Sequence, residues 1–429
     1  MNILFVSNDL IGGNVAYLLK KEGHNVRLFI DDNNRRENFE NLVEKTEDWK
    51  KELSWVGKDG LIVFDDVGYG KIQDDLRKDG YTVFGGSELG ERLERDRDFG
   101  QKIFREQGLQ TVTLKDFDTI QSAIAFVKNN PRAWVIKQND HHYSKVSNYV
   151  GEFDDGRDVI DMLENYARNP RTTDQKISLH QKIIGVEMGV GRYFNGTDWV
   201  GPIEFNIEYP RFFPGDIGPL TSEMGTLAWY SDDENNRFYR DVLQKLKPFL
   251  STTGFRGDFE VNCIVNESGA YPLEATARFG SPIVHLQTEI HDSPWGEFLY
   301  AVARGEQYDL RWKRGYGIVV VGAVPPFPYI EERSRSLVCG ARVFFDKCSK
   351  EELKHIHFEE VSERDGCYIV SDCRGYVLYV TGLSEKVSLA QEKAYGILKK
   401  ICIPKLFYRN DIGESFLKNE NKLRQWGYL

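Results

Sequence analysis

Residues 1–95 contain the feature that most constrains the fold, an alternation of short apolar segments with helix-forming ones. Ile3–Ser7, Asn25–Ile30, Leu61–Phe64 and Thr82–Phe84 are short and largely apolar, and Gly12–Gly23 contains a predicted helix. Continuous apolar strands separated by helices are typical of a parallel sheet that helices cover on both faces. We therefore expect an α/β domain that ends near Arg95.

Residues 96–325 have more strands and fewer helices between them. The strand-like segments are 133–137, 177–180, 189–194, 199–205, 257–265 and 271–277, and the helical segments are 120–128, 158–167 and 236–250. This pattern predicts α+β layers. The proline-rich segment Pro325–Pro328 is a linker signal, and beyond it residues 326–429 form a small α+β region. Its predicted strands are 342–345, 368–371 and 377–381, followed by a helix over 388–401.

Composition narrows the class of protein. The 429 residues carry a formal net charge of −10, which argues against a nucleic-acid or anionic-membrane partner. No apolar run approaches the roughly 18 residues of a membrane span. Met1 leads directly into a strand without a signal-peptide pattern, and the six cysteines have no metal-ligand spacing. We therefore expect a cytoplasmic protein with reduced thiols.

A predicted hairpin carries three carboxylates. Asp258 and Glu260 alternate with apolar residues and share one strand face, and Glu274 lies on the returning strand with Arg278 after it. Mg²⁺ prefers a few carboxylates together with nucleotide phosphates, and an arginine nearby can neutralise a phosphoryl group. The alternative is a solvated sheet face with a surface salt bridge.

Two further segments are suited to a nucleotide. The apolar strand Trp134–Lys137 ends in a lysine, whose burial is costly without an anionic partner, and the polar stretch 138–149 could fold over phosphates. Around residues 180–187 a strand, a short connection and Glu187 could read an adenine edge and the ribose hydroxyls. The alternatives are an exposed edge strand and ordinary surface loops.

Two loops could either bind a ligand or simply connect elements of secondary structure. The turn Ser7–Asn14 follows a strand and opens a helix, where backbone N–H groups can hold a phosphate; the alternative is an ordinary βα turn. The Gly- and Pro-rich stretch Phe213–Gly225 can bring backbone donors close to a small substrate; the alternative is a long connecting loop.

Together these segments resemble the glycinamide ribonucleotide synthetase (phosphoribosylamine–glycine ligase) family of the ATP-grasp superfamily, in the family's order along nearly the whole chain. The resemblance is carried by residues 84–87, 135–137, 185–187, 216–219, 273–282 and 407–413. It implies a Rossmann-like N-terminal domain (1–95), an ATP-grasp domain (96–325) and a C-terminal α+β domain (326–429).

The resemblance also implies roles for particular residues. ATP would be bound by Arg97, Lys137, Gln181, Lys182, Ile183 and Glu187. Arg278 and Lys145 would act on the transferred phosphoryl group. The small substrate would meet Asp216, Gly218, Pro219 and Met224. Mg²⁺, or alternatively Mn²⁺, would be held by Glu260, Glu274 and Asp258, with the choice between Asp258 and Glu260 left open.

The implied reaction is ATP-dependent joining of a carboxylic acid to an amine through an acyl phosphate, by a monomer or homodimer. The sequence departs from the family pattern in several places. The flap 139–148 lacks glycines, Asp65–Gly68 replace a G-P-E segment, and Thr276 stands where the family has a metal-binding asparagine. Two alternatives therefore stay open: a ligase of the same fold with other acid and amine substrates in a specialised pathway, and a catalytically weak nucleotide-binding relative.

Overall fold

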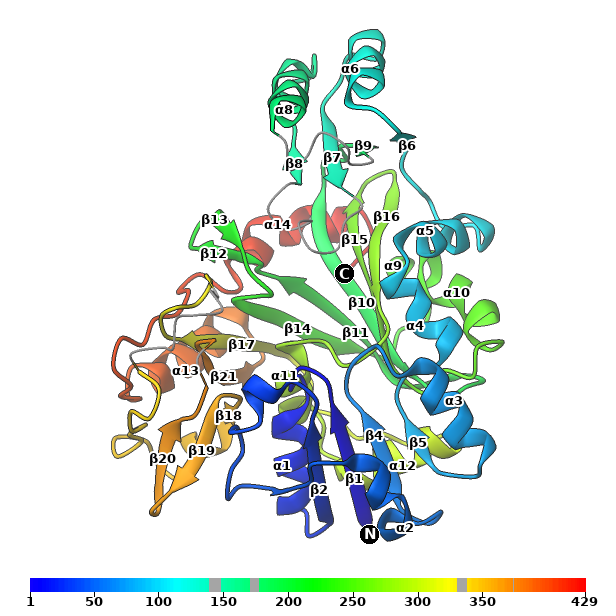
Figure 1. Cartoon of the computed structure of the whole chain (residues 1–429). Helices are drawn as coiled ribbons and strands as arrows, with labels where there is room; N and C mark the ends of the chain where they lie inside the picture. Colours follow the sequence, from blue (N-terminus) through cyan, green and yellow to red (C-terminus); the bar gives the residue numbers. More distant parts are fainter. Residues whose placement is uncertain (139–147, 170–176, 330–337, 373) are drawn as a thin grey trace. The chain divides into compact units, whose positions relative to one another are not determined.

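The N-terminal segment forms a parallel five-stranded sheet in the order β3-β2-β1-β4-β5 (Figure 1). The computed structural model describes residues 1–138, 148–169, 177–329, 338–372 and 374–429. The strands are β1 (Asn2–Ser7), β2 (Asn25–Ile30), β3 (Glu44–Lys45), β4 (Leu61–Phe64) and β5 (Val83–Phe84). The predicted parallel sheet is confirmed, and only the two-residue β3 was not predicted.

Helices cover both faces of this sheet because its strands are apolar on both sides. Leu4 and Val6 pack on one face with Val56 and Leu76, whereas Phe5 points to the other face and contacts Gly12, just before α1. The helical elements of this segment are α1 (Gly13–Lys21), η1 (Asn33–Arg35), η2 (Trp49–Glu52), α2 (Leu53–Val56), α3 (Gly70–Lys78), α4 (Glu88–Arg95) and α5 (Arg97–Glu106).

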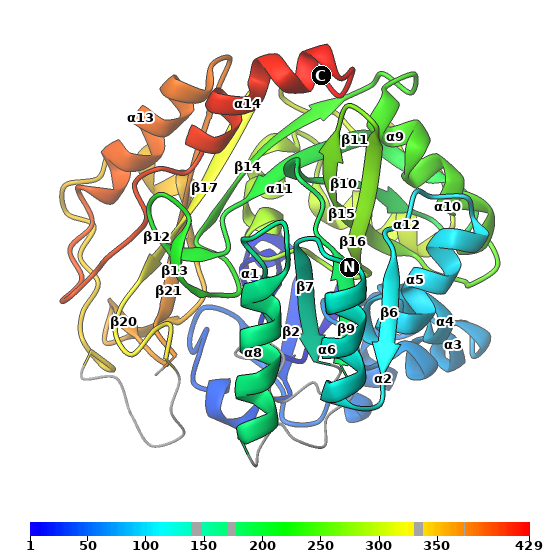
Figure 2. The same ribbon diagram turned by 90° about the horizontal axis from the view of Figure 1, so that it is seen from above.

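The largest sheet has eight strands in the order β16-β15-β10-β11-β14-β17-β21-β18, and neighbours from β10 to β18 are antiparallel. The strands are β10 (Val186–Phe194), β11 (Trp199–Glu208), β14 (Gly225–Ser231), β15 (Gly257–Asn266), β16 (Gly269–Thr276), β17 (Tyr316–Ala323), β18 (Ile356–Phe358) and β21 (Tyr376–Ser384). Figure 2 shows β11, β14 and β17 side by side, with α13 (Val387–Leu398) packed along β17 and β21.

Short elements complete this part of the chain. They are β12 (Arg211–Phe213), β13 (Ile217–Leu220), α9 (Arg237–Asp241), α10 (Leu243–Leu250), α11 (Ile283–Ile290), α12 (Trp295–Arg304), η3 (Glu352–His355), β19 (Val361–Arg364), β20 (Cys367–Val370) and α14 (Glu414–Gln425). The predicted strand at 342–345 is wrong. Arg342 bridges Ile369 whereas Phe344 bridges Cys402, so the segment pairs with two different partners and no ladder extends.

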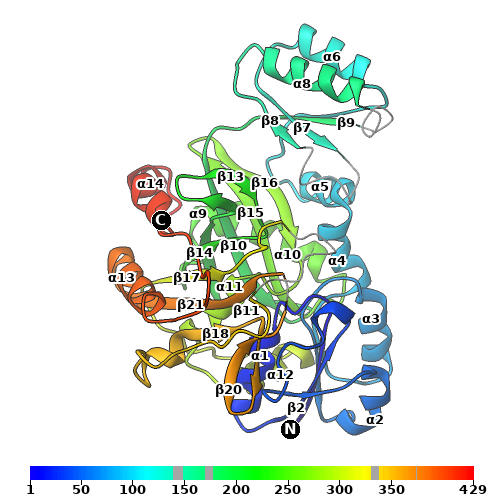
Figure 3. The same ribbon diagram turned by 60° about the vertical axis from the view of Figure 1, so that its left-hand side comes forward.

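A second compact unit comprises residues 110–186 and 264–271, and the first comprises 1–109, 187–263 and 272–429. The second unit has a four-stranded sheet, β6-β9-β7-β8, with α6 (Ile120–Asn129) and α8 (Arg157–Arg168) on one face (Figure 3). Its strands are β6 (Leu114–Phe117), β7 (Trp134–Gln138), β8 (Tyr149–Val150) and β9 (Ile177–Gln181). Trp134, Ile136 and Leu163 belong to its own apolar core.

The three predicted domains, with boundaries near residues 95 and 325, stay a prediction. The strands β17 and β21, on either side of Pro325–Pro328, are neighbours in one sheet. Among the described helices, none is long and apolar enough to cross a membrane.

Candidate active site

Two strands of the eight-stranded sheet present polar side chains at every second position. They are Glu204, Asn206 and Glu208 on β11, and Asp258, Glu260 and Asn262 on β15. The strand between them, β10, has Gly189 where a Cβ would lie 2.2 Å from Glu260 Oε1. Because Gly189 has no side chain, side chains of β11 and β15 can contact each other across β10. Asn206 Nδ2 donates a hydrogen bond to Glu260 Oε1 at 2.9 Å.

Burial makes this face electrostatically unusual. It raises the pKa of Glu260 to about 7; the charge of Glu274 acts in the same direction, and Asn206 and Arg278 act against it. Burial likewise raises the pKa of Asp258 to about 7. It raises the pKa values of Glu204 and Glu208 well above their usual range, reinforced by the neighbouring carboxylates. Carboxyl groups that repel one another and lack water favour protonation or a bound cation.

The three predicted metal ligands differ in their surroundings. Asp258 is buried and its Oδ2 accepts from Gln287 Nε2 at 3.0 Å, while the same Nε2 donates to Glu204. Glu274, on β16, is exposed. In the part of the chain that is described, no group of three or more His, Cys, Asp or Glu side chains is arranged to hold a metal ion. Such a cation would therefore need ligands from a bound molecule as well.

Two arginines flank this face. Arg97 opens α5, and its Nε is buried without a hydrogen-bond partner among the described residues. Burial lowers the pKa of Arg97, and the negative charge of Glu274 opposes that shift. Arg278 follows β16 and donates from Nε to Glu94 Oε1 at 2.9 Å. A guanidinium with an unused buried N–H is suited to an anionic ligand such as a phosphate.

The residues predicted to bind the nucleotide belong mainly to the second unit. Lys137 is on β7, half-buried, and pairs through its backbone with Ser178 on β9. Gln181 ends β9, and the half-buried Ile183 lies in the connection to β10. The ammonium group of Lys182 donates to the carbonyl of Gly151 at 2.7 Å.

Glu187 and Lys145 do not belong to the described part of the second unit. Glu187 belongs to the first unit, where Asn262 Nδ2 donates to its Oε1 at 3.2 Å. Lys145 lies outside the described residues, as does most of the predicted flap.

The predicted substrate loop is a short ribbon of β12 and β13, not an irregular connection. Asp216 lies at its turn with φ of 58° and accepts from Arg409 Nη2 at 2.8 Å. Gly218 and Pro219 are on β13. Met224 has a packing role instead, because its side chain is fully buried and its backbone N–H and carbonyl are both hydrogen-bonded, to Tyr209 and Val321.

Several donors of the turn Ser7–Asn14, which the sequence suggested as a possible phosphate site, are hydrogen-bonded within the protein. Asp65 Oδ2 accepts from Gly12 N–H and from Ser7 Oγ, both at 2.7 Å, and Ser7 Oγ accepts from Leu10 N–H at 2.7 Å. These three donors are thus already satisfied, which favours the reading of an ordinary βα turn. Burial raises the pKa of Asp65 to about 7, and the charge of Asp66 adds to the shift.

A cavity of about 280 Å³ lies within the first unit. Its described lining includes four carboxyl groups and three guanidinium groups, from Asp9, Asp66, Glu94 and Glu359 and from Arg35, Arg278 and Arg374. A wall of alternating charges is suited to a small polar molecule.

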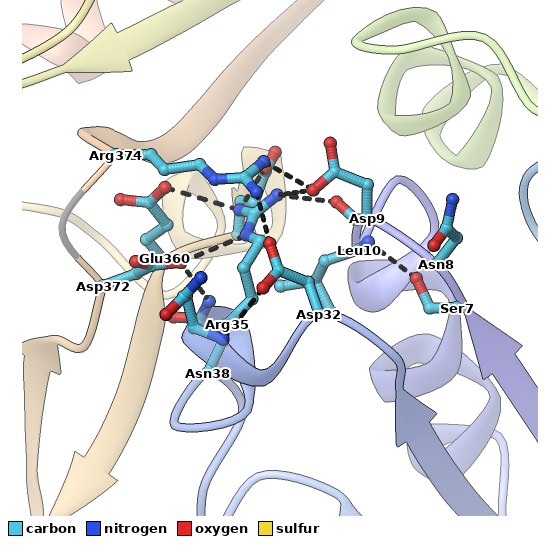
Figure 4. Close-up of polar contacts among 12 residues, drawn as sticks. Ser7, Asn8, Asp9, Leu10, Asp32, Arg35, Asn38, Glu360, Asp372 and Arg374 are labelled. Carbon is cyan, nitrogen blue, oxygen red and sulfur yellow. Dashed lines mark hydrogen bonds and ion pairs between the residues drawn. The ribbon is translucent and has the colours of Figure 1, made fainter. Parts of the chain in front are cut away.

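The guanidinium groups of Arg35 and Arg374 are held by carboxylates (Figure 4). Arg35 is 3% exposed and donates to Glu359 at 2.6 Å and to Asp372 at 3.1 Å. Arg374 pairs with Asp9 and Asp32. Burial raises the pKa of Glu359 to about 7 even though Arg35 acts against the shift. Each arginine charge is therefore largely neutralised before any ligand enters.

Arg278 is neutralised in the same way. Besides Glu94, it faces Asp66, whose Oδ1 lies 3.4 Å from Arg278 Nε. Glu94 also accepts from the backbone N–H of Ala277 at 2.8 Å. Glu94 thus fixes the segment after β16 to α4 and sets the position of the guanidinium.

The sequence motifs indicated Asp66 and Arg278 but missed Arg35, Glu359 and Arg374. Arg35 is more than 300 residues from Glu359 and Arg374 in the sequence, and each of the three reads locally as an ordinary charged surface residue. The adjacent acidic pair Glu359–Glu360, directly after β18, was the only local signal in the described part of the chain.

The chain is similar to known proteins over most of its length. The family model described as the phosphoribosylglycinamide synthetase ATP-grasp (A) domain matches residues 95–284. A phosphoribosylamine–glycine ligase of Mycobacterium leprae is 25% identical over 392 residues, which are 88% of this chain and 87% of that protein. A phosphoribosylamine–glycine ligase of Caldanaerobacter subterraneus is 23% identical over 80% of this chain and 82% of that protein.

The fold is also shared with a solved structure of phosphoribosylamine–glycine ligase from Thermotoga maritima. The TM-score is 0.70 at 20% identity, and the match covers 96% of this chain and 100% of that one. The chain is therefore an ATP-dependent, C–N bond-forming ligase, and its residues 95–284 match the phosphoribosylglycinamide synthetase ATP-grasp (A) domain.

Proposed function

We propose that this ligase joins a carboxylic acid to an amine that carries no phosphate group, through an acyl phosphate. The observation that carries the proposal is the charge pattern of the 280 Å³ cavity, in which Arg35, Arg278 and Arg374 are each paired with carboxylates. A phosphorylated amine needs free cationic donors, whereas an ammonium group is favoured by an acidic lining.

The repulsion between Asp66 and a phosphate group in the cavity can be estimated. Its side chain is 10% exposed and lies on the cavity wall. A phosphate oxygen about 4 Å from a carboxylate meets a repulsion of about 4 kcal/mol per pair of unit charges at an effective dielectric constant near 20. That repulsion corresponds to almost three decades in affinity. Arg278 offsets part of it, but Arg278 is shared with Glu94.

The residues of the sheet face fit a magnesium ion that arrives with ATP. Glu260 and Glu274 would hold it together with phosphate oxygens, since Mg²⁺ usually takes one or two carboxylates and substrate phosphates. Asp258 is less suited because Gln287 already binds one of its oxygens. When bound, the ion would neutralise charge on the transferred phosphoryl group.

The chain's own groups would then align the reactants. Arg97, whose buried Nε has no hydrogen-bond partner among the described residues, would bind phosphate oxygens of ATP, and Glu94 fixes the direction of Arg278 beside the transferred group. Asp9, Asp66 and Glu359 would hold the ammonium group of the acceptor near the acyl carbon. ATP phosphorylates the acid, the amine nitrogen attacks the acyl carbon, and phosphate leaves with the C–O bonding pair.

Hydroxylamine provides the test, because it is a small amine that traps acyl phosphates as hydroxamates. The protein is incubated with ATP, Mg²⁺, hydroxylamine and a panel of carboxylic acids, and ADP and hydroxamate are measured. We expect at least one acid to give both products in equal amounts. In parallel, glycine with phosphoribosylamine should give little glycinamide ribonucleotide.

Two outcomes contradict the proposal in different ways. Formation of glycinamide ribonucleotide at an ordinary enzymatic rate of roughly 1–1,000 per second would return the protein to the family's standard substrates. Binding of ATP without ADP release for any acid would instead support a nucleotide-binding relative without ligase activity.

A further inference from the structure

Asp66 occupies a distinctive position on the cavity wall. It follows β4, and its Oδ1 accepts from the N–H of Val67 at 2.7 Å and lies 3.4 Å from Arg278 Nε. Its Oδ2 has one contact among the described residues, at 3.4 Å from Asn8 Nδ2. One carboxylate oxygen is thus anchored while the other is nearly unused, and the residue lines the cavity.

The other carboxylates that line the cavity form closer hydrogen bonds and ion pairs within the protein. Glu94 uses both oxygens, on Arg278 and on the N–H of Ala277. Asp9 and Glu359 are both ion-paired with the buried Arg35. Asp66 is therefore the lining carboxylate that is close to Arg278 and still able to accept a proton.

The charges around Asp66 favour this role. Burial raises its pKa, Arg278 opposes the shift, and Glu94 and Asp9 add to it. The buried Asp65, next to it in the chain, is a further acidic neighbour. A carboxylate with a raised pKa is a stronger base than one in water.

We propose that Asp66 is the base that removes a proton from the acceptor amine as its nitrogen attacks the acyl phosphate. The proposal rests on the ligase function proposed above. An ammonium group gives one proton to Asp66 Oδ2, and the freed lone pair forms the C–N bond. The C–O bond to phosphate breaks, and phosphate leaves with the electron pair. The second proton of the nitrogen goes to the leaving phosphate, and Asp66 returns its proton to solvent.

Methylamine and hydroxylamine separate this role from a positioning role. The two molecules have nearly the same size, but at neutral pH methylamine is an ammonium ion and hydroxylamine is uncharged. Asp66→Asn should lower the methylamide rate on the order of 100-fold, the usual scale of general base catalysis. The hydroxamate rate should change less than about threefold, because no ammonium proton has to be removed.

Glu94→Gln serves as the matched comparison, because Glu94 also contacts Arg278 but has no unused oxygen. We expect it to lower both rates to a similar extent. If Asp66→Asn does the same, Asp66 only positions Arg278 and the proposal is overturned. If the unmodified protein makes no hydroxamate with any acid, the ligase function fails, and the role of Asp66 with it.

The unmodified protein gives a second test that needs no variant. With a base in the site, kcat/KM for methylamine should rise with pH and level off well below the pKa of methylamine itself. A rate that keeps rising up to the pKa of methylamine would show that only the free amine binds, and it would contradict the proposal.

Discussion

At the scale of single residues, burial separates side chains that look alike in the sequence. Glu260 and Glu274 lie on the two strands of one hairpin, but Glu260 is 6% exposed with a raised pKa, whereas Glu274 is exposed. Gly189 and Gly191 lie two positions apart on β10, yet only a Cβ at Gly189 would collide with the acidic face. Residue type alone therefore does not assign a role.

Glu274→Gln should abolish most Mg²⁺-dependent turnover and leave stability unchanged. Loss of a metal-binding carboxylate should lower kcat on the order of 100-fold. The side chain is exposed, so the melting temperature without Mg²⁺ should match that of the parent or exceed it slightly. Glu267→Gln, an exposed carboxylate in the turn of the same hairpin, is the control and should have normal turnover. A large fall in melting temperature would indicate a structural role for Glu274.

Gly189→Ala should destabilise the protein, because its Cβ would lie 2.2 Å from Glu260 and 2.3 Å from Asn206. Overpacking of this kind costs about 1–3 kcal/mol. Gly191→Ala is the matched control, since its nearest neighbours are 3.4 Å away, and its free energy of unfolding should change by less than about 0.5 kcal/mol. Equal effects of the two changes in urea unfolding would refute the steric argument.

At the scale of elements, a hydrogen bond whose strength depends on the protonation of His355 joins α11 to η3. Glu289, on α11, accepts from His355 Nδ1 at 3.0 Å and lies 3.4 Å from His357 Nε2. The hydrogen bond from His355 lowers the pKa of Glu289 in spite of burial, and the bond to Glu289 raises the pKa of His355. Attachment of the C-terminal strands to α11 should therefore depend on pH.

His355→Gln should cost about 1 kcal/mol near pH 5.5, a usual value for a partly exposed charged hydrogen bond. The raised pKa of His355 means that its contribution is complete below about pH 6.5 and disappears as pH rises through the folded-state pKa. Urea unfolding of both proteins from pH 5 to pH 9 measures the difference. In a Glu289→Gln background the pH dependence should vanish, and its persistence would exclude the pair as its origin.

At the scale of the whole molecule, the chain forms two compact units with separate apolar cores. The second unit is built from residues 110–186 and 264–271 around Trp134, whereas Trp295 is buried in the first unit. Interior packing within one unit should influence the local stability of that unit more than that of the other.

Trp134→Ala should therefore open the second unit selectively. Removing a fully buried tryptophan costs about 3–5 kcal/mol, and hydrogen exchange should accelerate in residues 110–186 while residues 187–263 keep their protection. ATP binding should weaken, because Lys137 and Gln181 are in the affected unit. Trp295→Ala is the control and should give the opposite pattern. Uniform acceleration along the chain after Trp134→Ala would show that the two units unfold together.

Local patterns predicted most of the fold. The apolar runs of β1, β2 and β4, and the alternation along β15, were readable because strand periodicity depends only on neighbouring residues. The segment 342–345 failed because pairing depends on partners elsewhere in the chain. The order of the ATP-grasp motifs was likewise readable, because each motif is a short contiguous segment.

By itself, therefore, the sequence determined the type of sheet, the ATP-grasp class and the carboxylate hairpin. Only the tertiary structure decided that Asp66 borders a cavity with Arg278 and Glu359, and that Met224 packs in the core. It also decided which carboxyl groups have raised pKa values, as Asp258 does. The physical reason is that periodicity is a local property of the chain, whereas burial and charge pairing depend on residues that folding brings together from distant segments.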